Sequence, residues 1–419
     1  MAVSASSSRR TKKRGDGNGR KGAFLLTINA GSSSLKFALF RADVSLTRVL
    51  RGGVERIGLE DSAFSVTDLV SGETERRPVR APSHGSCIDM LLDLIERKAG
   101  PDGVKAIGHR LVHGGPSYAE PQRVTTEMIE ELRRLIPLAM EHLPSEIEWI
   151  EAFSKRYPKC PQVACFDTAF HSDLPRVSRM LPLPRRLEAL GLRRYGFHGL
   201  SYEFLMQELS RLDPATSGGR RVILAHLGNG ASMAAVRDGK CVDTSMGFTP
   251  AAGLVMGKRT GDLDPGIFIH LARTEKMSAD EFHRMVNQQS GLLGVSGASS
   301  DMRELLALES SDVRAAEAIA LFCHQARKWI GSYAAVLGGL DTLVFAGGIG
   351  ENCSTVRSRI CDGLGFLGIE LDEGRNQANA PVISGAGGKT VARVIRTDEE
   401  LMIARSVEKI LSNKLRKAG

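Results

Sequence analysis

Short runs of hydrophobic residues, some alternating with polar ones, predict β-strands in both halves of the chain. The predicted strands are 24–28, 35–40, 163–166, 222–227, 231–237 and 342–346. The first two flank a polar glycine turn at 29–34, and the fourth and fifth flank a tight turn at 228–230. This repetition, two hundred residues apart, favours an internal duplication.

Other segments place apolar residues three and four apart, the spacing of amphipathic helices. The predicted helices are 127–136, 145–156, 280–289, 301–309, 315–337, 354–364 and the last twenty residues from 400. The segment 315–337 carries Glu317, His324, Arg327 and Lys328, so it predicts a buried helix and not a membrane span. Strands interleaved with helices indicate an α/β fold.

A chain of 419 residues exceeds the size of one ordinary core, so we expect two domains. Hydrophobic residues at 42% and charged residues at 25% exclude collagen-like, wholly disordered and membrane-embedded chains. No low-complexity linker marks the boundary, which we place after the predicted strand 163–166. The predicted parts are a basic tail at 1–22, a first domain at 23–167, a second at 168–398, and a helix at 399–419 that packs back on the first.

Positive charge is concentrated near the N-terminus. The net charge of the chain is +8. Residues 9–21 contain seven Lys and Arg residues and one acidic residue, Asp16, so this stretch alone has a net charge of +6. The body therefore gives no support for nucleic-acid binding. The tail itself fits a disordered segment, a transit peptide or a polyanion contact.

The seven cysteines are odd in number, scattered and without a Cys-x-x-Cys pair. In a chain of this size they indicate free thiols in a reducing compartment, so we expect a cytoplasmic protein.

Three glycine-containing segments could hold phosphate groups. Residues 29–36, 226–232 and 347–352 each follow a predicted strand, and small residues there let backbone N–H groups approach an anion. The alternative for each is a plain structural turn, which is weakest for 29–36 because three serines lie there between Gly31 and Lys36. The segment 253–259 resembles a Walker A loop, but Ala252 replaces its first glycine and Arg259 its Ser or Thr, so it is not one.

Several cations sit beside glycines within otherwise apolar stretches. They are Arg110 in 108–115, His198 in 194–199 and Arg259 in 256–265. Arginines in such settings form buried ion pairs or bind carboxylate and phosphate. Together with Asp167, they favour an active site that handles anions. His109 and His113 are four apart, but the glycines around them argue against a helical zinc pair.

The ordered set of motifs resembles the acetate kinase family. It comprises Ile-Asn-Ala-Gly-Ser-Ser-Ser-Leu-Lys, Gly-His-Arg-x-Val-His-Gly-Gly, Phe-Asp-Thr-Ala-Phe-His, Tyr-Gly-Phe-His-Gly, His-Leu-Gly-Asn-Gly, Asp-Thr-Ser-Met-Gly-Phe-Thr-Pro and Gly-Gly-Ile-Gly-Glu-Asn, between about 24 and 410. The resemblance implies two duplicated actin-like (ribonuclease H-like) α/β domains with ATP in the cleft between them. It also implies phosphoryl transfer to acetate, Mg²⁺ (with Mn²⁺ as a substitute) and a homodimer.

The resemblance assigns roles to matching positions. Asp167, His198 and Arg259 match catalytic residues, and Asn29 and Glu399 match magnesium positions. The acceptor-acid positions are Arg110, Val112, His142, Phe197 and Pro250. The ATP positions are Ser32, Ser34, Lys36, His226, Leu227, Gly228, Asn229, Gly230, Asp301, Met302, Arg303, Gly347, Gly348, Ile349, Gly350 and Glu351.

The residue types suit this chemistry because a small carboxylic acid is already ionised at pH 7. Its carboxylate can attack phosphorus without a general base, and the obstacle is repulsion between anions. We expect Arg110 to orient the carboxylate, Arg259 and His198 to hold the transferring group, and Asp167 to orient an arginine or a metal-bound water.

Two departures bear on the acceptor acid. Glu141 stands where the family has an aliphatic residue, within Glu-His-Leu-Pro in place of Leu-His-Asn-Pro, and Lys258 replaces a threonine. A carboxylate at 141 would repel acetate or alter the pocket, so a propionate or butyrate kinase remains an alternative. A non-enzymatic actin-like protein is a third, although Arg110, His198 and Arg259 are all present. A sugar kinase is disfavoured because its hydroxyl substrate would need a base.

Overall fold

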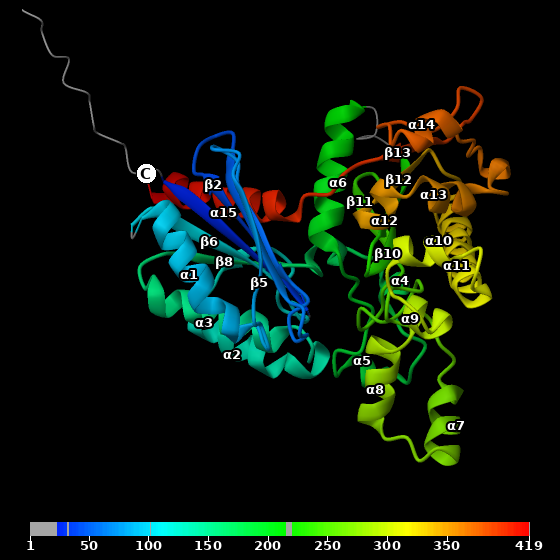
Figure 1. Cartoon of the computed structure of the whole chain (residues 1–419), viewed down its shortest axis with the longest axis horizontal. Coiled ribbons are helices and arrows are strands. Elements are labelled where there is room, and N and C mark those ends of the chain that lie inside the picture. The colour runs from blue at the N-terminus through cyan, green and yellow to red at the C-terminus, as the bar shows by residue number, and fades with distance from the viewer. Residues whose placement is uncertain (1–22, 32, 101, 215–219, 419) are drawn as a thin grey trace, which may run out of the picture.

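The computed structural model describes residues 23–31, 33–100, 102–214 and 220–418, with side chains through Ser412. The predicted tail and the predicted phosphate residue Ser32 lie outside the described residues. The chain forms two β-sheets, one in each half of the molecule along its long axis, and each is flanked by helices (Figure 1).

The first sheet has the order β5-β4-β3-β2-β1-β6-β8-β7. Its strands are β1 (Phe24–Ala30), β2 (Ser34–Arg41), β3 (Arg48–Glu55), β4 (Ala63–Asp68), β5 (Thr74–Pro78), β6 (Val104–Leu111), β7 (Gln122–Arg123) and β8 (Gln162–Phe166). Strand β1 pairs antiparallel with β2 and parallel with β6, and β6 pairs parallel with β8.

The second sheet has the order β11-β10-β9-β12-β13. Its strands are β9 (Arg221–Leu227), β10 (Ala231–Arg237), β11 (Lys240–Thr244), β12 (Thr342–Ala346) and β13 (Val391–Val394). Strand β9 pairs antiparallel with β10 and parallel with β12. The run β3-β2-β1-β6-β8 of the first sheet thus has the same order and directions as the second sheet, which confirms the predicted duplicated α/β fold.

The predicted helices form within a few residues of their expected limits. The helices are α1 (Gly85–Ala99), α2 (Thr126–Arg134), α3 (Leu143–Arg156), α4 (Arg176–Arg179), α5 (Arg185–Glu188), α6 (Gly199–Leu212), α7 (Gly266–Thr274), α8 (Ala279–Gln288), α9 (Gly291–Ser296), α10 (Met302–Leu308), α11 (Val313–Leu337), α12 (Gly347–Asn352), α13 (Ser354–Cys361), α14 (Glu373–Gln377) and α15 (Glu399–Ala418). Short 3₁₀ turns lie at Ile136–Leu138, Ala169–His171 and Gly365–Leu367. Polar caps begin several helices; α8, for example, starts with a capping box between Ser278 and Glu281.

Helix α15, red in Figure 1, returns to the first sheet and packs on β1 and β6. Gly108 on β6 permits this close approach, because a Cβ there would lie 2.4 Å from Ile403 and 2.7 Å from Val407. The return brings Glu399, the first residue of α15, to Asn29 near the end of β1. The division into domains at 23–167 and 168–398 stays a prediction.

Apolar side chains fill three cores around the sheets. One face of the first sheet packs against α1 and α3, with Ile28 and Trp149 among the buried residues. Its other face packs against α6 and α15. The largest core joins the second sheet to α11 and extends to α2 and α3. These rigid layers hold the strand ends from which the site is built.

All seven cysteines are free thiols. No helix in the described part of the chain has the length and apolar content needed to cross a bilayer.

Candidate active site

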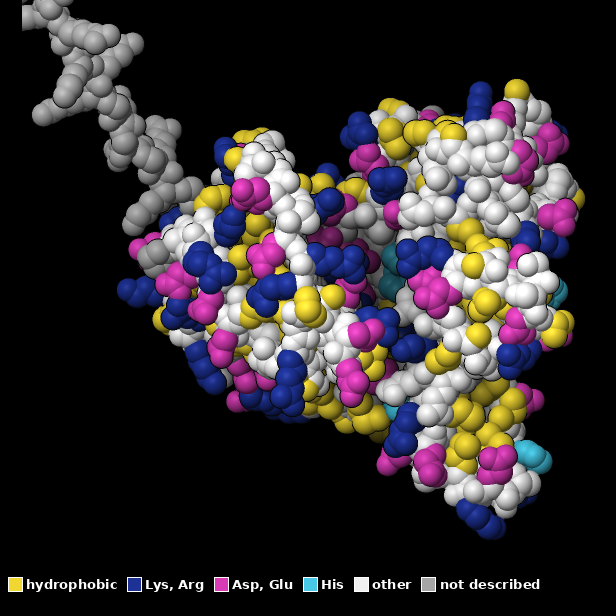
Figure 2. Space-filling view, viewed as in Figure 1, with side chains coloured by type: hydrophobic (Ala, Val, Ile, Leu, Met, Phe, Trp, Pro, Cys, Tyr) yellow, Lys and Arg dark blue, Asp and Glu magenta, His cyan; other side chains and the backbone are white. Residues whose placement is uncertain are grey.

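A cavity of about 940 Å³ lies between the two halves. Figure 2 shows this hollow, with basic and histidine side chains along it. Its lining includes, from the first half, Asn29, Gly31, Ser33, Ser34, Lys36, Arg110, Glu141 and His142, and from the rest of the chain His198, His226, Asn229, Gly230, Lys258, Arg259, Gln288 and Glu399. Many of the predicted site residues therefore share one cleft.

Asn29 anchors one end of the cleft at the end of β1. Its amide donates hydrogen bonds to Glu399 at 2.9 Å and to Glu400 at 3.1 Å. Burial raises the pKa of Glu399, but the charges of Arg110, His226 and Lys36 outweigh it and lower that pKa overall. The Glu399 carboxylate is therefore held in its ionised form beside the polar turn between β1 and β2.

The turn between β9 and β10 forms the facing wall. The backbone N–H of Gly228 donates to the carbonyl of Gly230 at 3.0 Å, and Asn229 accepts a backbone bond from Gly257 at 2.9 Å. A Cβ at Gly230 would lie 3.3 Å from Nε2 of His198 and 3.9 Å from Nη1 of Arg259. The absence of a side chain thus leaves room at the point where these two groups converge.

His198 precedes α6 in a left-handed conformation, with φ of 58°. Its Nδ1 pairs with the hydroxyl of Ser232 at 2.8 Å, and its ring stacks on His226 at 4.3 Å. Burial, followed by the nearby His226, Arg110 and Arg259, holds the pKa of His198 well below its usual value. The imidazole is therefore neutral and fixed in place, and its Nε2 is the nitrogen nearest Gly230.

Arg110, at the end of β6, is 12% exposed and is held by Asp167, the residue after β8. Its Nη2 and Nε donate to one carboxylate oxygen of Asp167 at 2.6 and 3.0 Å, and Nη1 donates to the carbonyl of Ala30 at 2.8 Å. Burial opposes the charge on Arg110, but Asp167, Glu399 and Glu146 raise its pKa. Asp167 thus holds the guanidinium of Arg110 by two hydrogen bonds.

Arg259 reaches the same cavity from the second half. Among the described residues, no carboxylate lies within ion-pair distance of its guanidinium. Burial lowers its pKa, the charge of Glu141 raises it, and Arg110 lowers it further. The charges of the two arginines therefore repel each other across the cleft. The charge of Arg110 is neutralised in part by Asp167, whereas Arg259 has no such partner among the described residues.

Some predicted site residues lie away from the cavity lining. Val112 and Phe197 are buried, and Pro250 is half-buried; none of them lines the cavity as it stands. Asp301 caps α10 by accepting from the N–H of Arg303, and also pairs with the Arg303 side chain at 2.6 Å. The cavity includes the neighbouring Ser300 but not this segment.

The predicted adenosine loop forms helix α12 beside the turn between β9 and β10. Gly347 has φ of 74°, and a Cβ there would lie 2.7 Å from the carbonyl of Leu227. Glu351 accepts from the N–H groups of Gly347 and Thr397, each at 3.0 Å. The loop therefore packs closely against the end of β9. It is also hydrogen-bonded, through Glu351, to the segment that leads into α15.

The two departures from the family pattern line the cleft. The carboxylate of Glu141 accepts a hydrogen bond from Gln288 at 2.9 Å and lies 3.7 Å from His283, so it bridges the segment before α3 to α8 in the other half. Lys258 is exposed and lines the cavity. Glu141 therefore adds negative charge to the cleft, and Lys258 adds positive charge.

Two acidic residues near the site were not anticipated from the sequence. Glu400 binds the same amide as Glu399. Glu146, in the first turn of α3, is 2% exposed and accepts from the N–H of Val112. A sequence signal did exist for Glu146: it lies three residues after Leu143 and four before Ile150, on the apolar face of its helix.

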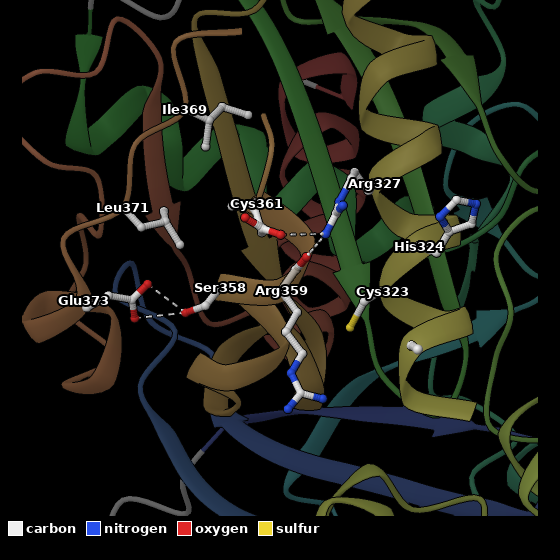
Figure 3. Close-up of a pocket in the computed structure, with 11 residues that line it drawn as sticks. Cys323, His324, Arg327, Ser358, Arg359, Cys361, Ile369, Leu371 and Glu373 are labelled. Atoms are coloured by element: carbon white, nitrogen blue, oxygen red, sulfur yellow. Dashed lines mark hydrogen bonds and ion pairs between the residues drawn. The ribbon is translucent and has the colours of Figure 1, made fainter. Parts of the chain in front are cut away.

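A second cavity, of about 630 Å³, lies between α11 and α13 (Figure 3). Both of its arginines already have partners. Arg359 pairs with Glu309, and Arg327 binds main-chain carbonyls of α13 and lies 3.7 Å from Asp362. Burial raises the pKa of Cys323 to about 11. The positive charges of this cavity are therefore already balanced by carboxylates, whereas Arg259 in the cleft is not paired with one in the described part of the chain.

The donor atoms near Asn29 fit a hard divalent cation. Within the described residues, no three His, Cys, Asp or Glu side chains are grouped as a metal site. Magnesium, however, is usually bound by one or two carboxylates together with substrate phosphates. The amide of Asn29 and the carboxylates of Glu399 and Glu400 supply oxygen atoms of this kind at the cleft.

Comparison with known proteins identifies the family of the chain. The model of the acetokinase family matches residues 24–405. An acetate kinase from Methylocella silvestris is 47% identical over 91% of this chain and 96% of its own, and a propionate kinase from Citrobacter rodentium is 42% identical over 92% and 96%. The crystal structure of Porphyromonas gingivalis acetate kinase superposes with a TM-score of 0.83 at 37% identity, covering 93% of this chain and all of that one. The chain belongs to the acetokinase family.

Proposed function

We propose that this protein is an acetate kinase, which transfers the γ-phosphoryl group of ATP to acetate and forms acetyl phosphate and ADP. The observation that carries the proposal is the convergence of Arg110, Arg259 and His198 on one cleft between two glycine turns. Membership of a family of carboxylate kinases supports the same reaction.

In the proposed mechanism, Arg110 orients the acceptor carboxylate. Hydrogen bonds to Asp167 fix the position of the Arg110 guanidinium for this role. One carboxylate oxygen attacks Pγ in line with the bond from Pγ to the β–γ bridging oxygen of ATP. A new O–P bond forms as the old one breaks, and ADP leaves with the bonding electron pair. Arg259 and neutral His198 stabilise the charge on the transferring oxygens, so no general base is required.

The metal and nucleotide sites are part of this proposal. Asn29 and Glu399 would hold Mg²⁺, or Mn²⁺ in its place, and the bound cation would supply charge neutralisation for the phosphates. The turns at 33–36 and 226–230 would cradle the phosphates, while Asp301–Arg303 and Gly347–Glu351 would face the adenosine. Their backbone N–H groups and small residues suit this task.

The test is a hydroxamate assay with ATP, Mg²⁺ and a panel of short acids. Hydroxylamine traps acetyl phosphate, so the proposal predicts hydroxamate from acetate that depends on both ATP and Mg²⁺. The variant Arg110→Ala should lose most of this activity, whereas Arg273→Ala, an exposed arginine on α7, should keep it. Hydroxamate from no acid would refute the proposal and leave an ATP-binding protein.

A second candidate function is propionate kinase, or butyrate kinase within the same chemistry. It is favoured by the 42% identity to a propionate kinase and by Glu141 in the cleft. The predicted acceptor-acid residues Val112, Phe197 and Pro250, which lie outside the cavity lining, would accept the acyl chain. The ratio of kcat/KM among the three acids decides between them.

A cytoplasmic homodimer completes the proposal. Light scattering should give twice the chain mass of 45.3 kDa. A monomer at micromolar concentration would contradict this expectation.

A further inference from the structure

Glu146 lies next to Val112 and Arg110, two residues of the proposed acceptor-acid site. It comes from the first turn of α3, and its two carboxyl oxygens accept from the N–H of Val112 at 3.0 and 3.2 Å. One of these oxygens lies 4.0 Å from Nη1 of Arg110. Glu146 therefore contacts the backbone of Val112, which follows β6, and approaches Arg110 near the end of that strand.

Two carboxyl groups consequently share one buried cation. Asp167 is 1% exposed and binds Arg110 through a single oxygen, while its other oxygen is buried and has no hydrogen-bond partner among the described residues. If Asp167 and Glu146 were both ionised, this buried group would be net negative before any substrate arrived. A net negative site would repel an acceptor carboxylate.

We propose that Glu146 is a positioning residue for the acceptor acid: it anchors Val112 and Arg110, and its charge state sets how strongly Arg110 attracts the substrate carboxylate. This inference rests on the proposed function. It adds a residue that assists binding of the acid without touching it.

The surroundings of Glu146 support a proton at neutral pH. Burial raises its pKa to about 8, against the opposing effects of Arg110 and of the N–H of Val112, and Asp167 adds to the rise. The charged groups that face it are Arg110 from β6 and Asp167 from the segment after β8. His142, at the start of the same helix, has its pKa lowered to about 3 and stays neutral over this range.

A specific pH dependence follows. Well below pH 8 the Glu146 carboxyl is neutral and does not compete for the charge of Arg110, which then interacts with Asp167 and Glu399. Above pH 8, Glu146 ionises and competes with the substrate for Arg110, so KM for acetate should rise while kcat changes little. We expect a rise of roughly tenfold between pH 7 and 9, since a like charge several ångströms away opposes binding. Acetate itself stays fully ionised in this range.

The experiment measures kcat and KM for acetate from pH 6.5 to 9.5 in the wild type and three variants. Glu146→Gln should keep the wild-type KM at pH 7 and remain within about twofold of it at pH 9. Glu146→Ala, which loses the anchor as well, should raise KM at every pH. Glu148→Gln is the matched control, because this glutamate is exposed on the same helix, and it should follow the wild type.

Melting curves at each pH establish that every variant is folded. A wild-type KM that stays flat from pH 7 to 9 overturns the proposal even if Glu146→Gln fails to fold. A Glu146→Gln profile with the wild-type slope overturns the charge role, and a Glu146→Ala enzyme with normal KM overturns the anchoring role. A wild type that phosphorylates no acid refutes the proposed function as well, so the two failures are distinguishable.

Discussion

Replacement of Arg259 by alanine tests the central assignment of the proposed mechanism. The guanidinium of Arg259 lines the cleft near His198 and Gly230 and, among the described residues, has no carboxylate within ion-pair distance. The charge of Arg110, by contrast, is already shared with Asp167. Arg259 is therefore the cation best able to respond to charge that develops on the transferring phosphoryl group.

The magnitude follows from Coulomb's law. A unit charge about 4 Å from the transferring oxygens contributes about 4 kcal/mol at an effective dielectric constant of about 20. Part of that attraction is already present when ATP is bound, and only the additional part accelerates the reaction. Because about 1.4 kcal/mol corresponds to a tenfold change in rate, a part of this attraction should lower kcat roughly tenfold to a hundredfold.

The assay is the hydroxamate reaction with acetate and ATP varied in turn. KM for acetate should change less than about threefold in Arg259→Ala, the signature of an interaction made mainly in the transition state. Folding should be unharmed, because burial already disfavours the charge of Arg259; circular dichroism checks this. A variant with normal kcat and a raised KM would reassign Arg259 to substrate binding and refute the reasoning.

Further predictions concern three other positions. Glu141→Leu removes the hydrogen bond to Gln288 together with a negative charge in the cleft, and it should lower KM for acetate about threefold; a raised KM would mean that the contact favours binding. Gly230→Ala places a methyl group 3.3 Å from Nε2 of His198, and it should lower kcat about tenfold without loss of thermal stability, because this glycine does not have positive φ. Glu146 has its pKa raised from 4.5 to about 8, so its contribution to the unfolding free energy is complete below pH 4.5 and is lost as the pH rises through 8. Urea denaturation at pH 5.5 and 9 should therefore show a smaller loss of stability in Glu146→Gln than in the wild type, and equal losses would contradict the shift.

Local patterns in the sequence predicted part of the fold: strands β1, β2, β8, β9, β10 and β12 were expected, whereas β3, β4, β6, β7, β11 and β13 were not. The hairpins at β1–β2 and β9–β10 follow from apolar runs interrupted by glycine turns, and both form where predicted. The edge strand β5 was not predicted, because Thr74–Pro78 is polar and fully exposed, and it forms only by pairing with β4. Helix α12 was expected as a turn, since three of its six residues are glycine, which disfavours helix.

The candidate site shows a similar limit. The sequence singled out Arg110, Asp167 and Arg259, and the cleft brings the two arginines together. It could not show that the carboxylate of Glu141 would bind Gln288, because that partner lies 147 residues away on another helix. Nor could the sequence show that Glu146 and Asp167 would both lie beside Arg110. The ionisation of a buried carboxyl group depends on such neighbours, which only the tertiary fold brings close.

The duplication explains why one cleft is lined by two glycine-containing turns. In each sheet the first strand, β1 or β9, pairs antiparallel with the next strand and parallel with a later one, so its turn lies at the same edge of the sheet. The cavity is lined by both turns, by Arg110 from the end of β6, and by Glu399 where α15 returns to the first half. If the turns bind phosphate as proposed, duplication of an ancestral unit with one such turn would supply the second, and the facing arrangement would place the two turns on opposite sides of a polyphosphate.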